Sequence, residues 1–251
     1  MCGRFALYAD KTLLELFLGI PLFPAFSARY NLAPSQSCLF IKGETGGNLS
    51  PSNLSWGLIP AWAKDKSMAG KMINARAETI TEKPSFKSAF NKRRGIIPAN
   101  GFYEWKTTGK SKKPFFISPK DQSLLGFGGI WESNTHLGEE TIETFSIITT
   151  AANQDMNELH ERMPLIIPKG SWKTWLNHEG GNSADIAALL QQAPSGFLQL
   201  KEVRTLVNKV ANDSPECLLP PARDLFSDLD WHLFFWQKFS CLINCPDCKQ
   251  K

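Results

Sequence analysis

Short strand-like segments separated by polar turns run through most of this chain, and they constrain its fold more than any other feature. Apolar and β-branched stretches of a few residues recur between breaks rich in Gly, Ser and Asn. Only short helical segments lie among them, and no strand–helix unit repeats. The pattern predicts an α+β domain built around a curved, mostly antiparallel, barrel-like β-sheet with short flanking helices.

The expected elements can be assigned by residue range. Asp10 as N-cap and Gly19 as C-terminal stop predict a helix over 11–18, followed by a loop over 20–36. Two hairpins are expected, one from strands 38–42 and 54–58, the other from strands 95–106 and 114–118. Further strands are predicted at 124–131, 141–150, 165–167 and 198–210, and further helices at 171–176 and 183–192.

The chain divides unequally near Pro220. Residues 2–220 contain all the expected elements and form one predicted domain, and 221–251 form a C-terminal appendage. The appendage carries Cys241, Cys245 and Cys248, which with His232 have a spacing related to that of zinc and iron–sulfur sites. Only one Cys-x2-Cys pair is present, so we expect free thiols, no metal and no cofactor.

Composition excludes several classes of protein. With 251 residues, 42% hydrophobic residues and a net charge of +4, the chain is neither a disulfide-dense mini-protein nor a disordered tail. No apolar run reaches the roughly 18 residues of a membrane span, and the first residues have neither the apolar stretch nor the cleavage site expected of a secretory leader. We therefore expect a cytoplasmic protein whose six cysteines are reduced.

Cys2 is the residue that points most directly to chemistry. Removal of Met1 would leave a 1,2-aminothiol, which condenses with an aldehyde through its amine and then closes onto its thiol as a thiazolidine ring. An α-amine has a pKa near 8, against about 10.4 for Lys, so far more of it is the reactive free base at neutral pH. The alternative is that Met1 is retained, or that Cys2 is only a small buried residue.

Six motifs place unusual polar and aromatic residues together. They are Met-Cys-Gly-Arg-Phe at 1–5, Arg-Tyr-Asn-Leu-Ala-Pro at 29–34, Trp-Gly-Leu-Ile-Pro-Ala-Trp at 56–62, Asn-Ala-Arg-Ala-Glu-Thr at 74–79, Pro-Ala-Asn-Gly-Phe-Tyr-Glu-Trp at 98–105 and His-Glu-Arg-Met-Pro at 160–164. In content and order, over roughly 2–217, they resemble the SOS-response-associated peptidase (SRAP) family of abasic-site-processing proteins.

The resemblance implies a protein that recognises abasic sites in single-stranded DNA and links to them covalently through Cys2. The open-chain aldehyde of an abasic deoxyribose is the partner that the aminothiol requires. The linked thiazolidine would protect the lesion, and lyase activity at the Schiff-base stage and peptidase activity that removes Met1 are also implied. From the same resemblance we expect a monomer without membrane contact, associated with the nucleoid in a bacterium, with replication-fork proteins as candidate partners.

Three further residues are candidate catalytic groups because they match the family's motifs. Asn74 would orient the amine or thiol of Cys2 by hydrogen bonding, although Asn more often caps a turn. Glu104 would shuttle protons with a raised pKa, its alternative being a solvent-facing strand residue. His160 would act on the sugar ring oxygen or in proton transfer, its alternative being an exposed helix-end residue.

Arginines adjacent to these groups are the predicted DNA contacts. Arg4, Arg76 and Arg162 each lie within two residues of a predicted catalytic residue, where guanidinium groups grip phosphates. Trp62 is a candidate platform for base stacking, although a core tryptophan is its alternative. The lysines of 83–94 and 106–113 add either a diffuse basic track or solvated loops.

Two other functions stay open at this point. Class II glutamine amidotransferases also begin with Cys-Gly after removal of Met, so an N-terminal-nucleophile amidohydrolase acting through Cys2 is the main rival. Its long alternating strands and later motifs are missing here. A non-covalent single-stranded DNA-binding module is the second rival. Covalent capture of abasic DNA distinguishes the first function from both.

Overall fold

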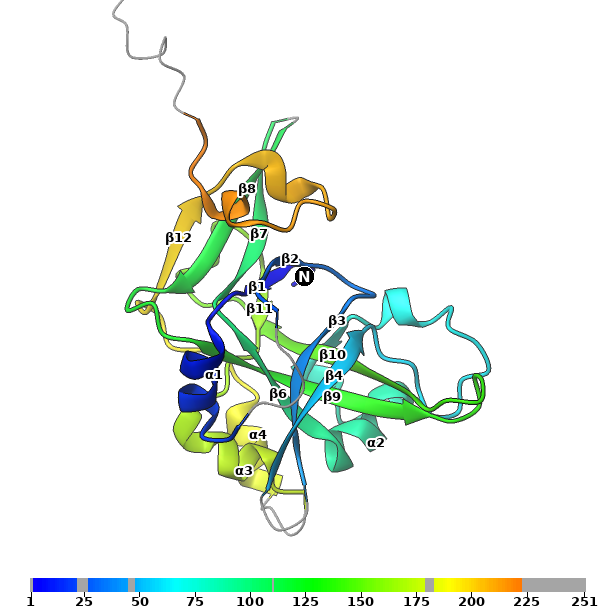
Figure 1. Ribbon diagram of the computed structural model, residues 1–251. Helices are drawn as coiled ribbons and strands as arrows, with labels where there is room; N and C mark the ends of the chain where they lie inside the picture. The colour runs from blue at the N-terminus through cyan, green and yellow to red at the C-terminus, as the bar shows by residue number, and fades with distance from the viewer. Residues whose placement is uncertain (1, 22–26, 45–47, 110, 179–182, 223–251) are drawn as a thin grey trace, which may run out of the picture. The chain divides into compact units, whose positions relative to one another are not determined.

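The computed structural model describes residues 2–21, 27–44, 48–109, 111–178 and 183–222 (Figure 1). Residues up to Pro220 form one compact unit. The predicted appendage, with Cys241, Cys245 and Cys248, falls outside the described residues apart from Pro221 and Ala222. No helix in the described ranges is long and apolar enough to cross a membrane.

A closed barrel of five strands forms the centre of the molecule. In pairing order its strands are β3 (Ser37–Gly43), β4 (Leu49–Trp56), β10 (Ile142–Ala151), β9 (Leu125–Asn134) and β6 (Arg94–Ala99). The ring closes because β10 pairs with both β4 and β9, and β4 with β10 is its single parallel pairing. Two short strands, β5 (Asn74–Arg76) and β11 (Arg162–Pro164), extend β10 beyond the barrel.

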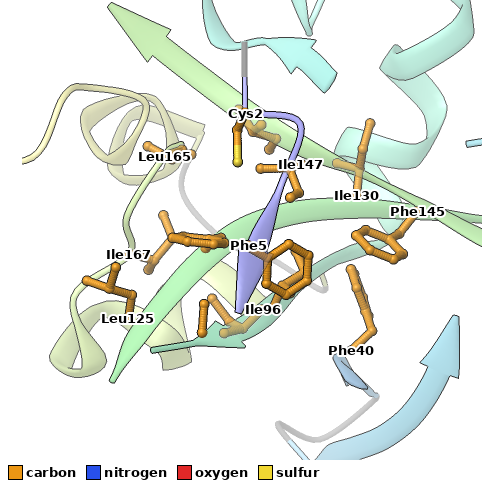
Figure 2. Close-up of a cluster of buried hydrophobic side chains, with 14 of the residues drawn as sticks. Cys2, Phe5, Phe40, Ile96, Leu125, Ile130, Phe145, Ile147, Leu165 and Ile167 are labelled. Atoms are coloured by element: carbon orange, nitrogen blue, oxygen red, sulfur yellow. The ribbon is translucent and has the colours of Figure 1, made fainter. Parts of the chain in front are cut away.

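Aromatic side chains fill the barrel core. Phe5 contacts Trp56 and Phe127 edge to face, with ring centroids 5.3 and 6.0 Å apart. Figure 2 shows Phe5 among buried side chains that include Phe40 and Phe145. Space for these rings requires glycine at Gly95, where a Cβ would lie 2.1 Å from a ring carbon of Phe40. The core thus specifies the barrel through tight packing.

A second, open sheet carries the N-terminal strand. Its strands in pairing order are β12 (Leu198–Glu202), β8 (Ser111–Pro119), β7 (Gly101–Thr108), β1 (Phe5–Leu7) and β2 (Arg29–Leu32). Side chains of a strand alternate between its two faces. Phe5 and Leu7 therefore enter the barrel core, whereas Ala6 packs with Tyr103 in a smaller core on the other face. Strand β1 is therefore fixed by packing on both of its faces, and this holds the preceding residue Cys2 against the barrel.

Four short α-helices flank the sheets: α1 (Lys11–Leu18), α2 (Pro84–Lys92), α3 (Trp172–Leu176) and α4 (Ser183–Leu189). The predicted ends of the first helix are confirmed. Asp10 accepts the Leu13 N–H over 2.8 Å, and Gly19 adopts a left-handed φ of 74° while donating to the Glu15 carbonyl. With this architecture the α+β, barrel-like fold class is confirmed.

The strand predicted over 95–106 is wrong in one respect, because it is two strands in different sheets. β6 belongs to the barrel and β7 to the open sheet. Asn100 lies at the break, where its Oδ1 accepts the N–H groups of Tyr8 and Ala9. The Asn100 N–H donates to the Ala6 carbonyl. Long-range pairing with the N-terminal segment interrupts a stretch that is continuous by local pattern.

Several other ranges needed adjustment. The strand predicted over 54–58 is β4, which begins earlier, and 83–94 contains the helix α2 where a solvated loop was one alternative. Strand β2 lies inside the predicted loop 20–36, because those residues become a strand only by pairing with β1. Strand β11 precedes the predicted 165–167, of which Ile166 forms only an isolated bridge to Phe127. Strand β12 ends at Glu202, and 205–208 form a 3-10 helix. The described helical turn around 153–159 ends at His160, whose N–H donates to the Met156 carbonyl.

Candidate active site

Cys2 lies buried where the N-terminal segment meets the barrel. Its side chain belongs to the same buried cluster as Leu165 and Ile147 (Figure 2). Burial and the carboxylate of Glu104 raise the pKa of the Cys2 thiol, which stays protonated at neutral pH. A thiol in this state needs a base close by before it can attack as a thiolate.

Asn74 fixes the backbone of this segment. Its Nδ2 donates to the Cys2 carbonyl oxygen over 2.8 Å. The three-residue strand that carries Asn74 pairs in parallel with β10, opposite Ile147, so the amide is placed by the sheet. The Asn74 Oδ1 is buried and has no hydrogen-bond partner among the described residues. One end of the amide therefore orients Cys2 while the other remains able to accept a hydrogen bond.

Glu104 comes from the middle strand of the open sheet. The Tyr103 N–H donates to the Arg4 carbonyl over 2.9 Å, continuing the β1–β7 pairing toward the N-terminus. Glu104 is only 5% exposed, which excludes the solvent-facing alternative. Burial raises the pKa of its carboxyl group to about 7, as expected from the sequence. Such a carboxyl group can take up and release a proton at physiological pH.

His160 has a defined protonation pattern. The backbone N–H of Arg162 donates to its Nδ1 over 2.9 Å, so the proton of the neutral ring lies on Nε2. Burial lowers the pKa of His160, which keeps the ring neutral at pH 7. The ring is half-buried, and His160 lies at the end of the turn around 153–159. His160 can therefore donate a hydrogen bond through Nε2.

Arg162 forms a bidentate ion pair. Its Nη1 and Nη2 donate to the two carboxylate oxygens of Glu78 over 2.6 and 2.9 Å, and Nη2 also donates to the Thr149 carbonyl. The pair joins β11 to the turn that follows β5, across β10. The Nε of Arg162 is buried without a partner among the described residues. Much of the predicted phosphate-binding capacity of Arg162 is thus directed to Glu78.

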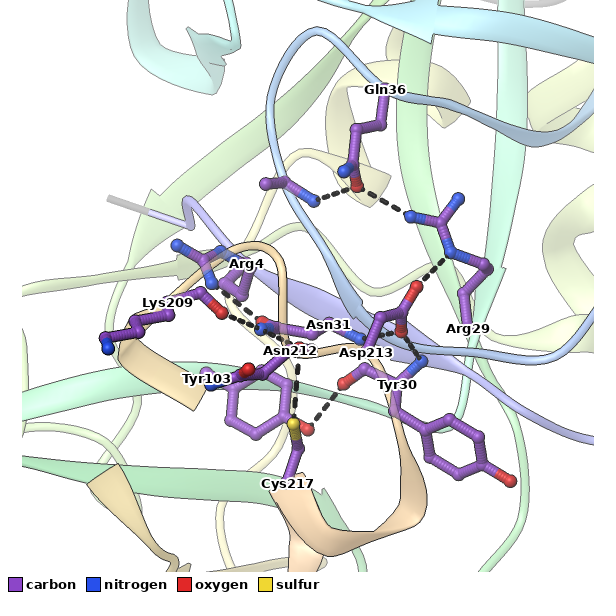
Figure 3. Close-up of polar contacts among 11 residues, drawn as sticks. Arg4, Arg29, Tyr30, Asn31, Gln36, Tyr103, Lys209, Asn212, Asp213 and Cys217 are labelled. Atoms are coloured by element: carbon purple, nitrogen blue, oxygen red, sulfur yellow. Dashed lines mark hydrogen bonds and ion pairs between the residues drawn. The ribbon is translucent and has the colours of Figure 1, made fainter. Parts of the chain in front are cut away.

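Arg4 is held by a polar network that the sequence did not reveal (Figure 3). Its Nη1 donates to Asn31 Oδ1 over 2.7 Å and to the Val207 carbonyl over 2.9 Å. Asn31 is fully buried, and Asp213 accepts its backbone N–H. The buried Nε of Arg4 has no partner in the described ranges. Motif 29–34 was the available signal for Asn31, although nothing in it indicated a contact with Arg4.

Two predicted DNA contacts lie at the surface. Arg76 is exposed on the strand that carries Asn74. Trp62 is 60% exposed, which excludes the core alternative. Exposed Lys64 and Lys66 follow it in the same loop. Asp65, which is also exposed, lies between the two lysines. An exposed aromatic ring such as Trp62 can stack on a base of a bound single strand.

The arrangement combines a buried nucleophile with unused hydrogen-bonding capacity. Asn74 contacts Cys2 directly, the charge of Glu104 acts on the Cys2 thiol, and His160 lies just before β11, which pairs with the same strand as the segment of Asn74. Buried polar atoms normally have partners, so the Nε atoms of Arg4 and Arg162 and the Oδ1 of Asn74 fit a site completed by a ligand with acceptor and donor groups. Within the described ranges, no group of His, Cys, Asp and Glu side chains is arranged to hold a metal ion.

Comparisons with known proteins agree on one family. The family model described as SOS response associated peptidase (SRAP) matches residues 1–210. The abasic site processing protein YoqW of Bacillus subtilis (strain 168) is 41% identical over 223 residues, covering 87% of this chain and 99% of that protein. The abasic site processing protein YedK of Escherichia coli (strain K12) is 32% identical over 227 residues, covering 88% of this chain and 100% of that protein.

A solved structure has the same fold. The crystal structure of a protein from Bacteroides thetaiotaomicron matches with a TM-score of 0.77 at 27% sequence identity. The match covers 88% of this chain and 100% of that chain. The barrel with its attached open sheet is therefore shared beyond the range of close sequence similarity.

Proposed function

The chain belongs to the SOS response associated peptidase (SRAP) family, and from this premise we propose that it processes abasic sites in single-stranded DNA by forming a covalent cross-link through Cys2. The relatives named as abasic site processing proteins support the substrate. The observation that carries the chemistry is the placement of Cys2, held by Asn74 and next to a carboxyl group with a pKa of about 7.

The first step requires a free amine at Cys2. Hydrolysis of the Met1–Cys2 peptide bond, by this protein itself or by another peptidase, consumes one water and supplies that amine. The amine adds to the aldehyde carbon of the opened deoxyribose, and loss of water gives an imine. A proton from the Glu104 carboxyl group converts the imine to the iminium ion. Asn74 orients the reacting residue through the Cys2 carbonyl, and its unpartnered Oδ1 accepts a hydrogen bond from the amine or from a sugar hydroxyl.

The second step closes the ring. The Cys2 sulfur attacks the iminium carbon, a C–S bond forms, and the thiol proton passes to the Glu104 carboxylate. The product is a thiazolidine that joins protein and DNA. Since each step is reversible, Glu104 can return the proton to sulfur and reopen the ring. Abstraction of a sugar proton at the iminium stage would instead lead to strand cleavage, the proposed lyase activity.

His160 and the arginines would act on the DNA side of the site. The neutral ring of His160 donates from Nε2 to the sugar ring oxygen while the deoxyribose opens. The buried Nε of Arg4 and the exposed guanidinium of Arg76 contact phosphates on either side of the lesion. Arg162 contributes through its Nε and keeps His160 in place through its backbone N–H.

A denaturing gel tests this function. The wild-type protein is incubated with a uracil-containing single-stranded oligonucleotide treated with uracil glycosylase. A shifted band is expected for wild type and for Cys38→Ala, a control at another buried cysteine, and no band for Cys2→Ala. Intact mass should show loss of Met1. A band that persists in Cys2→Ala would contradict the proposal. Glutamine hydrolysis would favour the amidohydrolase, and DNA binding without a shifted band would favour the non-covalent DNA-binding module.

A further inference from the structure

Lys106 lies at the border of the candidate active site and forms an ion pair with Glu158, which comes from a different segment of that site. Its Nζ is 3.2 Å from Glu158 Oε2. Lys106 follows Glu104 by two residues in β7, so strand alternation places both side chains on one face. Glu158 precedes His160 by two residues, in the turn that ends at that histidine. The ion pair therefore joins the two segments that supply Glu104 and His160.

The turn holds Glu158 in position independently of Lys106. Asn153 is buried, and its Nδ2 donates to the carbonyls of Ala193 and Pro194. Its Oδ1 accepts the Met156 N–H. The Glu158 carboxylate itself is 83% exposed, and the Lys106 side chain is 42% exposed. Exposed ion pairs of this kind are weak and screened by salt, so a second anion can displace the carboxylate.

We propose that Lys106 is a further contact for a phosphate of the single-stranded DNA, and that Glu158 is its counter-charge in the free protein. This inference rests on the proposed function for the identity of the ligand. When DNA binds, Lys106 exchanges the Glu158 carboxylate for a phosphate next to the abasic nucleotide. Breaking the pair costs part of the binding free energy, so Glu158 weakens DNA binding only by competing with the phosphate for Lys106.

The same hairpin contains a matched control. Lys113 lies directly opposite Lys106 in the β7–β8 register, one strand farther from β1. It pairs with Glu202 of β12 over 3.3 Å, with side chains 50% and 35% exposed. The two ion pairs have the same chemistry and similar length. Only the Lys106–Glu158 pair joins the segments of Glu104 and His160. A specific phosphate contact therefore predicts a larger effect on Kd for Lys106 than for Lys113, whereas a diffuse basic surface predicts equal effects.

The test measures binding to a single-stranded oligonucleotide carrying a tetrahydrofuran analogue, which has no aldehyde and cannot be cross-linked. Lys106→Met is expected to raise Kd several-fold at low salt and to lower the salt slope by about 0.7. Its penalty should therefore shrink by about 2.6-fold between 50 and 200 mM salt. Glu158→Gln is expected to lower Kd in the wild-type background and to have little effect in the Lys106→Met background.

Two results would overturn the contact. If Lys113→Met and Lys106→Met change Kd and the salt slope equally, the lysines act only as a diffuse positive surface. If Glu158→Gln changes Kd equally in both backgrounds, Glu158 does not act through Lys106. The cross-linking gel distinguishes failure of the proposed function, because a wild type that binds the analogue with the expected Lys106 dependence but never captures abasic DNA would refute only the covalent chemistry.

Discussion

The side-chain amide of Asn74 donates a 2.8 Å hydrogen bond to the backbone carbonyl of Cys2. This contact joins a three-residue strand at the end of β10 to the N-terminal segment, 72 positions away in the sequence. It positions the proposed nucleophile without using its thiol or its nitrogen. Asn74 therefore holds the Cys2 backbone without engaging either of the two groups that the proposed chemistry uses.

Asn74→Ala should reduce both stability and cross-linking. The Cys2 carbonyl would lose its donor, which costs about 1–3 kcal/mol of unfolding free energy when a buried acceptor is left unsatisfied. Denaturant unfolding measures that loss, and the rate of band formation on abasic DNA measures the loss of orientation. Asn91→Ala, at an exposed asparagine of α2, should change unfolding by less than about 0.5 kcal/mol. Unchanged cross-linking by Asn74→Ala would refute the orienting role.

Glu104→Gln should separate stability from function. The folded-state pKa of about 7 lies above the ordinary value of 4.5, so the unfolded state releases this proton first as pH rises. Wild type consequently loses stability between pH 4.5 and pH 7. The variant should be more stable above pH 7, by up to about 3 kcal/mol, and show no advantage below pH 4.5. Its cross-linking should slow while binding of the tetrahydrofuran analogue persists.

Thermal unfolding over a pH series measures the stability difference, with Glu82→Gln as an exposed control. A difference that is independent of pH would show that Glu104 is not held with a raised pKa. Binding lost together with cross-linking would show that Glu104 acts on affinity and not on proton transfer.

Trp62→Ala should weaken DNA binding and leave stability unchanged. The ring is 60% exposed, so its removal creates no cavity, whereas stacking on a base contributes about 1–3 kcal/mol of binding free energy. Trp62→Phe should retain a large part of the affinity because it keeps an aromatic face. Leu16→Ala, at a 74% exposed position of α1, serves as the control. Equal Kd values for wild type and Trp62→Ala would exclude the stacking role.

Glu78→Gln should destabilise the protein near neutral pH but not in acid. Hydrogen bonding to Arg162 lowers the pKa of Glu78, so the ion pair stabilises the fold above the ordinary carboxyl pKa and loses this effect as pH falls. The Tm difference between wild type and Glu78→Gln should accordingly narrow below pH 4.5. Arg162→Lys should also lower Tm at pH 7, since lysine cannot form the bidentate pair. A Tm difference that stays constant with pH would contradict this account.

Features set by neighbouring residues were predictable from the sequence. The Asp10 cap and the Gly19 stop depend on contacts within one helix, and the two hairpins depend on adjacent strands. The division of 95–106 at Asn100 was not predictable, because its cause is pairing with residues more than 90 positions away. Strand β2 was missed for the same reason, since β1 decides its pairing.

The sequence by itself determined the fold class, the ends of the first helix and the two hairpins, because periodicity and capping are local properties. It named the candidate side chains around Cys2 through motifs that resemble a known family. Only the tertiary structure decided how those side chains are used. It buried Glu104 and raised its pKa, and it paired Arg162 with Glu78 and Arg4 with Asn31. Desolvation and hydrogen-bond partners depend on segments far apart in the chain, and no local pattern records them.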